Sequence, residues 1–132
     1  MVNLISVEEF LPLEIEGKSN YNYKQLTTFV LKSPSLIIEE EEIKKYANNL
    51  KEKYPGIKIQ EKKIKGKKYF IIQGRLKGKL TPSLYYCYED KKIYVPKSWK
   101  EKKERLTKYI IWRALGFMEK LKIAHVKVIG RI

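Results

Sequence analysis

The side chains that most often perform catalysis are scarce in this chain. Its 132 residues include one histidine, His125, one cysteine, Cys87, and one aspartate, Asp90. Because acid–base and nucleophilic catalysis need paired groups with matched pKa values, this supply favours a protein that is not an enzyme. One thiol and one imidazole cannot form a cysteine-rich zinc site, and residues 74–78 lack the spacing of a phosphate-binding glycine loop. We therefore expect no catalytic site, no metal and no cofactor.

One spacing does match an enzyme, a metal-dependent nuclease. Asp90 followed by Glu101 and Lys103 fits the D…E-x-K order of restriction-type nucleases. In that fold the E-x-K residues lie on a core strand, whereas here Ser98 and Glu101 have the spacing of a capping box at a helix start. We expect the helix start. The nuclease alternative would show metal-dependent cleavage that is lost in Asp90→Ala.

Basic residues alternate with aromatic ones through the middle of the chain, and this pattern indicates a binding function. Single-stranded nucleic acid is commonly held by lysines that follow the phosphates and by exposed rings that stack on bases. A tyrosine on a strand can equally belong to the core, so a structural role stays open for each ring. The residues that we expect to contact nucleic acid are Lys62, Lys63, Lys65, Lys67, Lys68, Tyr69, Arg75, Lys77, Lys79, Tyr86, Tyr88, Lys100, Lys103 and Arg105.

The net charge of +14 is concentrated in the same region. Residues 44–105 carry 20 basic and 6 acidic side chains, whereas residues 1–43 carry 3 basic and 8 acidic ones. DNA or RNA is the commonest partner of such a surface, because each contacted phosphate releases bound counterions; an anionic membrane surface is the other partner that the charge permits. Only four of the basic residues are arginines, which favours contact with the nucleic-acid backbone over readout of base edges.

Hydrophobic periodicity predicts the α+β class: an antiparallel β-meander with one short and one long C-terminal helix, in a single domain of residues 1–132. The first thirty-five residues contain one clear strand at 25–31. The short helix begins at about Glu39, has Ile43, Ala47, Leu50 and Tyr54 on one stripe, and stops at Pro55-Gly56. Meander strands are expected at 57–64, 68–76, 84–88 and 92–95, with lysine-rich turns at 65–67, 77–79 and 89–91. The long helix should run from Ser98 to about Leu121, before a last strand at 123–129.

The long helix is apolar almost all round in its second half. One stripe includes Leu106, Ile110 and Phe117, and a second face carries Ile111, Leu115 and Met118. Burial on two sides has two explanations. The second face is either a homodimer contact or is covered by the N-terminal segment of the same chain.

The length and the ends of the sequence bear on where the protein acts. A chain of 132 residues matches one domain, and no stretch approaches the roughly 18 apolar residues that cross a bilayer. The first nine residues lack the basic start and apolar run of a secretion signal. We expect a protein without a membrane partner that acts inside the cell, in the host cytoplasm if it is viral.

In size, in its Lys-, Ile- and Tyr-rich composition and in its order of mixed strands before a long C-terminal helix, the chain resembles a viral family. It is similar to the small basic proteins of viruses of hyperthermophilic archaea, and most to the rudivirus proteins, from rod-shaped viruses of Sulfolobus, that bind single-stranded DNA without an OB fold. The resemblance implies a homodimer that coats single-stranded DNA during viral genome replication, beside a separately encoded helicase and nuclease. It rests on no motif, so it assigns no residue.

A second class of function is a structural or interaction protein, such as a virion component or an inhibitor of a host enzyme. Its sign would be a large apolar surface on the acidic N-terminal segment or on the second face of the long helix. The sequence leaves open whether DNA or RNA, and a single or a double strand, is bound.

Overall fold

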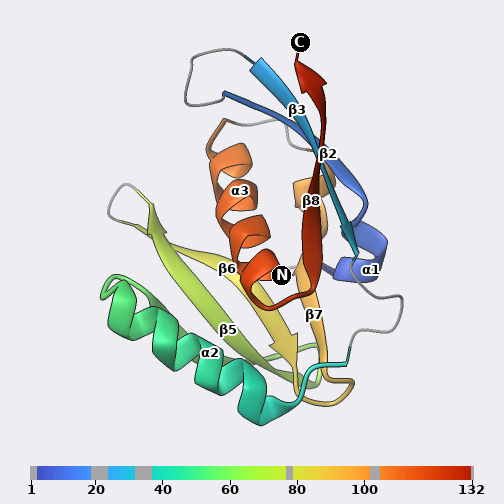
Figure 1. Cartoon of the computed structure of the whole chain (residues 1–132). Coiled ribbons are helices and arrows are strands. Elements are labelled where there is room, and N and C mark those ends of the chain that lie inside the picture. Colours follow the sequence, from blue (N-terminus) through green and yellow to red (C-terminus); the bar gives the residue numbers. More distant parts are fainter. Residues whose placement is uncertain (1–2, 19–23, 32–36, 77–78, 102–104, 132) are drawn as a thin grey trace.

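The computed structural model describes residues 3–18, 24–31, 37–76, 79–101 and 105–131, and it confirms the α+β class. The strands form two antiparallel sheets, a five-stranded sheet of order β1-β7-β6-β5-β4 and a three-stranded sheet of order β2-β3-β8 (Figure 1). The elements in chain order are β1 (Leu4–Ser6), α1 (Val7–Phe10), β2 (Leu13–Lys18), β3 (Lys24–Leu31), α2 (Glu40–Lys53), β4 (Lys58–Ile64), β5 (Lys67–Leu76), β6 (Lys79–Cys87), β7 (Lys92–Pro96), the 3₁₀-helix η1 (Lys97–Lys100), α3 (Arg105–Lys120) and β8 (Ala124–Arg131).

The predicted meander is present as β4, β5, β6 and β7, each antiparallel to the next. Strand β6 begins at Lys79, five residues earlier than predicted, although Pro82 lies within it. Proline has no N–H to give to a ladder, and the structure accommodates it at a bulge where the register shifts between Ile72 and Gln73. The sequence pattern broke at Pro82, whereas the strand continues through it.

Helix α2 forms where the helical period predicts it. Glutamates fill its first turn, where their negative charges interact favourably with the positive end of the helix dipole. Lys51 and Lys53 lie in its last turn, at the negative end. Its buried face consists of Ile43, Ala47 and Leu50, which join the main core. The helix therefore lies against the five-stranded sheet and presents its charged face outward (Figure 1).

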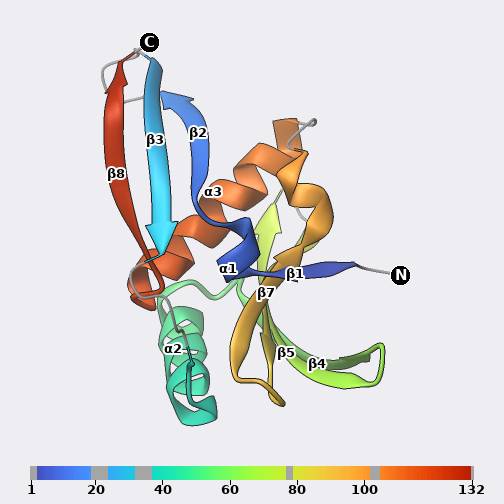
Figure 2. The same cartoon turned by 90° about the vertical axis from the view of Figure 1, so that its right-hand side faces the viewer.

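Helix α3 lies between the two sheets, as Figure 2 shows. Ile111, Leu115 and Met118 are each 0% exposed within the single chain. Of the two explanations for this face, the homodimer contact is therefore wrong, because the protein's own core already covers the three residues, and that core includes residues of the N-terminal segment such as Val7 and Phe29. Part of the cover comes from the three-stranded sheet, where Phe29 of β3 meets Trp112 edge to face at 5.5 Å between ring centroids.

The predicted start of the long helix is also wrong. Residues 97–100 form a 3₁₀ turn whose N-cap is Pro96 and whose cap makes no side-chain hydrogen bond. The backbone N–H of Glu101 donates to the carbonyl of Ser98, so this pair continues the turn instead of forming a capping box. The described part of α3 begins at Arg105.

The N-terminal segment contributes elements that the sequence pattern did not reveal. Strand β1 is three residues long and extends the meander by pairing with β7, with Ile5 opposite Val95. Ser6 then caps α1 by accepting a hydrogen bond from the N–H of Glu9. Elements of three and four residues are too short to show a period in a sequence.

None of the helices in the described part of the chain is both long enough and apolar enough to span a membrane.

We expect Leu115→Ala to lower the free energy of unfolding by about 2–5 kcal/mol without changing the mass of the protein in solution, because Leu115 packs inside one chain. Urea denaturation and light scattering measure the two quantities. Ile37→Ala is the matched control, since Ile37 is 63% exposed and its loss should change stability by less than about 0.5 kcal/mol. A Leu115→Ala protein of normal stability and half the mass would instead identify a dimer contact.

Candidate nucleic-acid interface

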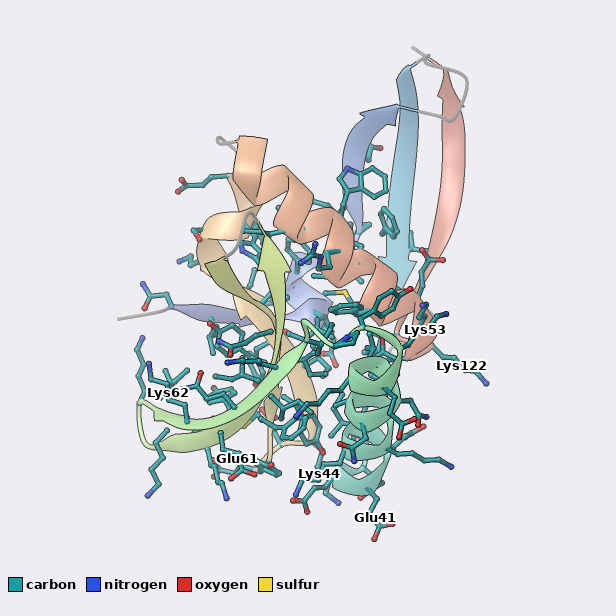
Figure 3. The ribbon with its side chains drawn as sticks, turned by 90° about the vertical axis from the view of Figure 1, so that its left-hand side faces the viewer. Glu41, Lys44, Lys53, Glu61, Lys62 and Lys122 are labelled. Carbon is teal, nitrogen blue, oxygen red and sulfur yellow. The ribbon has the colours of Figure 1, made fainter. Side chains whose placement is uncertain are left out.

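The β4–β5 hairpin concentrates positive charge on an exposed ribbon. It extends from the body of the molecule in Figure 2, and Lys62 lies on it in Figure 3. Between residues 58 and 68 the only acidic residue is Glu61. The exposed lysines of this segment, here called the hairpin lysines, are Lys58, Lys62, Lys63, Lys65, Lys67 and Lys68.

The tip of the hairpin is a two-residue turn made by Lys65 and Gly66. Both have positive φ, 51° and 82°, which is the pattern of the type I′ turn that fits the twist of paired strands. Lys65 Nζ donates a hydrogen bond to Asn3 Oδ1 at 2.9 Å. This contact brings the tip next to β1, at the opposite edge of the five-stranded sheet, so the sheet is strongly curled.

The curl encloses a second, smaller core on the face that does not join the main core. Its buried members are Tyr69, Ile71, Tyr85 and Cys87, and its described residues all belong to strands. Lys62 is paired with Tyr69, and Lys67 with Ile64, so both lysines border this face. A cavity of about 240 Å³ opens beside them, and its lining includes three of the predicted contact residues, namely Lys65, Lys67 and Tyr69.

On the other face of the hairpin, Glu61 offsets part of the charge. Its carboxylate lies 3.1 Å from Lys68 Nζ and accepts a hydrogen bond from the Tyr88 hydroxyl at 2.8 Å. These two hydrogen bonds hold the pKa of Glu61 below its ordinary value of 4.5. A lowered folded pKa means that the contact is complete above pH 4.5 and is lost only as the pH falls through the folded value, so Lys68 is paired at neutral pH.

The stacking role predicted for Tyr69 and Tyr86 is wrong, because both rings are inside the protein. Tyr69 is 6% exposed and meets Tyr85 and Tyr94 edge to face. Tyr86 is 1% exposed and its hydroxyl donates to the carbonyl of Ile38. Burial raises the pKa of Tyr86 to about 12. Tyr69 and Tyr86 lie on opposite faces of the five-stranded sheet, and each face has its own core.

Tyr88 is half-buried, and its ring already has cationic neighbours. The ammonium groups of Lys44 and Lys68 lie 5.4 and 5.1 Å from its centroid, and Phe70 and Tyr86 meet its ring edge to face. Burial and the hydrogen bond to Glu61 raise the pKa of the Tyr88 hydroxyl. Packing against Phe70 and Tyr86 covers part of this ring and fixes it at the base of the hairpin.

The remaining predicted contact residues are placed less completely. Lys100 is exposed in η1. The backbones of Arg75, Lys79 and Arg105 lie in β5, β6 and α3, but their side chains are outside the described part, as are Lys77 and Lys103 altogether.

Two exposed lysines, Lys58 on the hairpin and Lys97 near its tip, are not among the predicted contact residues. Lys58 begins β4, and Lys97 begins η1. The N–H of Lys97 donates to the carbonyl of Asn3, the residue whose side chain accepts from Lys65. Only the curl of the sheet brings Lys97 toward the hairpin tip, so no local sequence signal could have indicated it.

The described structure does not bring Asp90 and Glu101, two residues of the nuclease pattern, together in one site. Asp90 lies in the β6–β7 turn, where its carboxylate accepts hydrogen bonds from the N–H of Lys92 and the hydroxyl of Tyr94. Glu101 follows η1, at the other end of β7. Within the described ranges, no three His, Cys, Asp or Glu side chains form a group that could hold a metal ion.

Comparison with known proteins gave no match to a protein-family model, a curated protein or a solved structure. A functional interpretation therefore depends on the chain's own residues.

We expect Lys65→Asn to keep the fold and to raise the free energy of unfolding by up to about 1 kcal/mol. Lysine at positive φ is strained, whereas asparagine tolerates this conformation and Asn-Gly is the preferred type I′ pair. Urea denaturation measures the change, with Lys63→Asn on the neighbouring strand as the control that should not gain stability. A loss of stability in Lys65→Asn would show that its contact with Asn3 outweighs the strain in the turn.

Proposed function

We propose that this protein binds single-stranded DNA through its backbone, largely without sequence preference, using the hairpin lysines. The observation that carries the proposal is a projecting ribbon of six exposed lysines with a single acidic residue. In the described structure, Lys62, Lys63 and Lys67 have no ion-pair partner. Such a surface attracts a polyanion and contacts phosphates as flexible point charges.

The spacing of these lysines supports an anionic partner in a second way. Lys63 and Lys68 lie directly opposite one another on adjacent strands. Like charges in this arrangement destabilise a sheet, and Glu61 relieves only the Lys68 side. A bound phosphate chain would relieve the repulsion along the whole ribbon, so binding and hairpin stability should reinforce each other.

The resemblance to rudivirus proteins leads to the same activity and adds a cellular role. On that basis we propose action during viral genome replication, inside the host cell. A homodimer would have to use a surface other than Ile111, Leu115 and Met118. The interaction-protein alternative lacks its expected sign on the described surface, where the exposed large hydrophobic residues are Ile37 and Tyr54, on separate segments.

Affinity for a single-stranded oligonucleotide should fall steeply with salt, by about 0.7 logarithmic units per tenfold salt for each phosphate contact. We expect Lys62→Gln/Lys67→Gln to weaken binding of all sequences alike and to reduce the slope by about 1.4. Fluorescence anisotropy at several salt concentrations measures both.

The matched control removes the same charge from α2, in Lys45→Gln/Lys51→Gln, where both lysines are exposed. It should keep most of the salt slope. A flat salt response of the unmodified protein would sink the electrostatic mechanism, and tighter binding of duplex DNA than of the single strand would contradict the choice of ligand.

We expect Glu61→Gln to tighten oligonucleotide binding roughly 2- to 5-fold, the range of a surface ion pair, because it removes the hairpin's one acidic group and releases Lys68. Glu41→Gln makes the same change in net charge at the exposed start of α2 and should have a smaller effect (Figure 3). Equal effects of the two variants would mean that net charge, and not the hairpin, controls affinity.

A further inference from the structure

A larger pocket lies away from the hairpin tip, where the end of α2 meets β5 and α3. Its volume is about 430 Å³, within the range of small-ligand sites. Its walls come from three parts of the chain that are distant in sequence: Tyr54 and Ile57 after α2, Gly74 in β5, and Trp112, Gly116 and Phe117 in α3.

Aromatic rings form part of this pocket and one of them is open to solvent. Tyr54 is 46% exposed, the most of any large aromatic side chain in the described structure. Trp112 is half-buried and meets Phe29 edge to face. The rings that the hairpin tyrosines could not supply for base stacking are therefore present here.

The same pocket has a cationic border. The ammonium groups of Lys53 and Lys120 lie 5.7 and 5.8 Å from the centroid of the Tyr54 ring, and the side chain of Arg113 lines the wall. Figure 3 shows Lys53 at the end of α2 that faces α3. Among the described residues that line the pocket, none is acidic. An aromatic surface bordered by cations suits a ligand that has a flat ring next to an anionic group.

Two glycines shape the pocket, one by leaving open space and one by making room for Arg113. A Cβ added to Gly116 would meet no atom within 4 Å, so this position of α3 is empty although glycine weakens a helix interior. A Cβ added to Gly74 would lie 2.6 Å from Arg113 Nη1, so the bare backbone of β5 lets the arginine side chain lie against it. The shape of the pocket therefore depends on the absence of a side chain at Gly74 and Gly116.

We propose that this pocket binds one nucleotide, with its base against Tyr54 and Trp112 and its phosphate near Lys53 and Lys120. The nucleotide has two sources with the same chemistry, a bound single strand and a free mononucleotide. For the first source, the proposal rests on the proposed function. Strand β4 begins one residue after Ile57 and leads to the hairpin tip, a length of about 23 Å for its seven residues. A single strand could follow it, with an unpaired base in the pocket and phosphates along the hairpin lysines.

The test compares a thymidine oligonucleotide with an abasic oligonucleotide of the same length, which has the phosphates without the bases. The protein should prefer the first by roughly 5- to 100-fold, the value of stacking one or more bases. Tyr54→Ala and Gly116→Met, which fills the pocket, should each reduce the preference toward unity and leave abasic binding unchanged. Tyr54→Phe keeps the ring and Gly116→Ala strengthens the helix, so both controls should retain it.

Each other outcome has one meaning. Equal binding of the two oligonucleotides, or a preference that survives both Tyr54→Ala and Gly116→Met, overturns the pocket while the proposed function stands. If neither oligonucleotide binds at low salt, the proposed function fails. Thymidine 5′-monophosphate then decides the pocket alone: quenching of tryptophan fluorescence that Gly116→Met abolishes supports a free-nucleotide site, and no quenching overturns it.

Discussion

The burial of α3 on both sides is the constraint on which the rest of the structure depends. A helix that is apolar almost all round needs two surfaces to cover it, and one five-stranded sheet supplies only one. The three-stranded sheet supplies the other through residues such as Phe29. In the described structure the far face of the five-stranded sheet packs only residues of its own strands. That sheet can therefore curl on itself, and the curl brings the β4–β5 tip to Asn3.

Much of the fold could be predicted from local patterns. The stripe of Ile43, Ala47 and Leu50 gave α2 to within about a residue, and the lysine-glycine turn at 65–66 gave the first hairpin. Besides the local errors at Pro82 and Ser98, the sequence could not show which elements lie opposite a buried face. The face with Ile111 was correctly identified as buried, but the sequence could not decide between a second copy and the N-terminal segment as its cover. Alternation sorted Tyr85 and Tyr86 onto two faces, and no local pattern could show that both faces are enclosed.

The candidate interface divides in the same way. Exposure of the hairpin lysines follows from their type, because lysine is rarely buried without a partner, and the structure places all six at the surface. Tyr69 and Tyr86, the rings expected to stack on bases, are buried, whereas Tyr54, which the helical period places on the apolar stripe of α2, is 46% exposed. It lies where α2 stops, so its ring leaves the stripe and stands half exposed. The pocket beside it joins residues 54, 74 and 112, a combination that only the tertiary fold creates.

The pairing of β3 with β8 has a consequence for how the chain acquires its structure. Leu31 of β3 is opposite Ala124 of β8. The central strand of the smaller sheet can therefore pair with β8 only after about ninety further residues have been synthesised. Until then one apolar side of α3 lacks its cover, and the loop that must close is long. Contacts of this separation slow folding and leave apolar surface exposed to aggregation during synthesis. Conversion of the nascent chain to a compact protein should therefore be a late event, completed by its final strand.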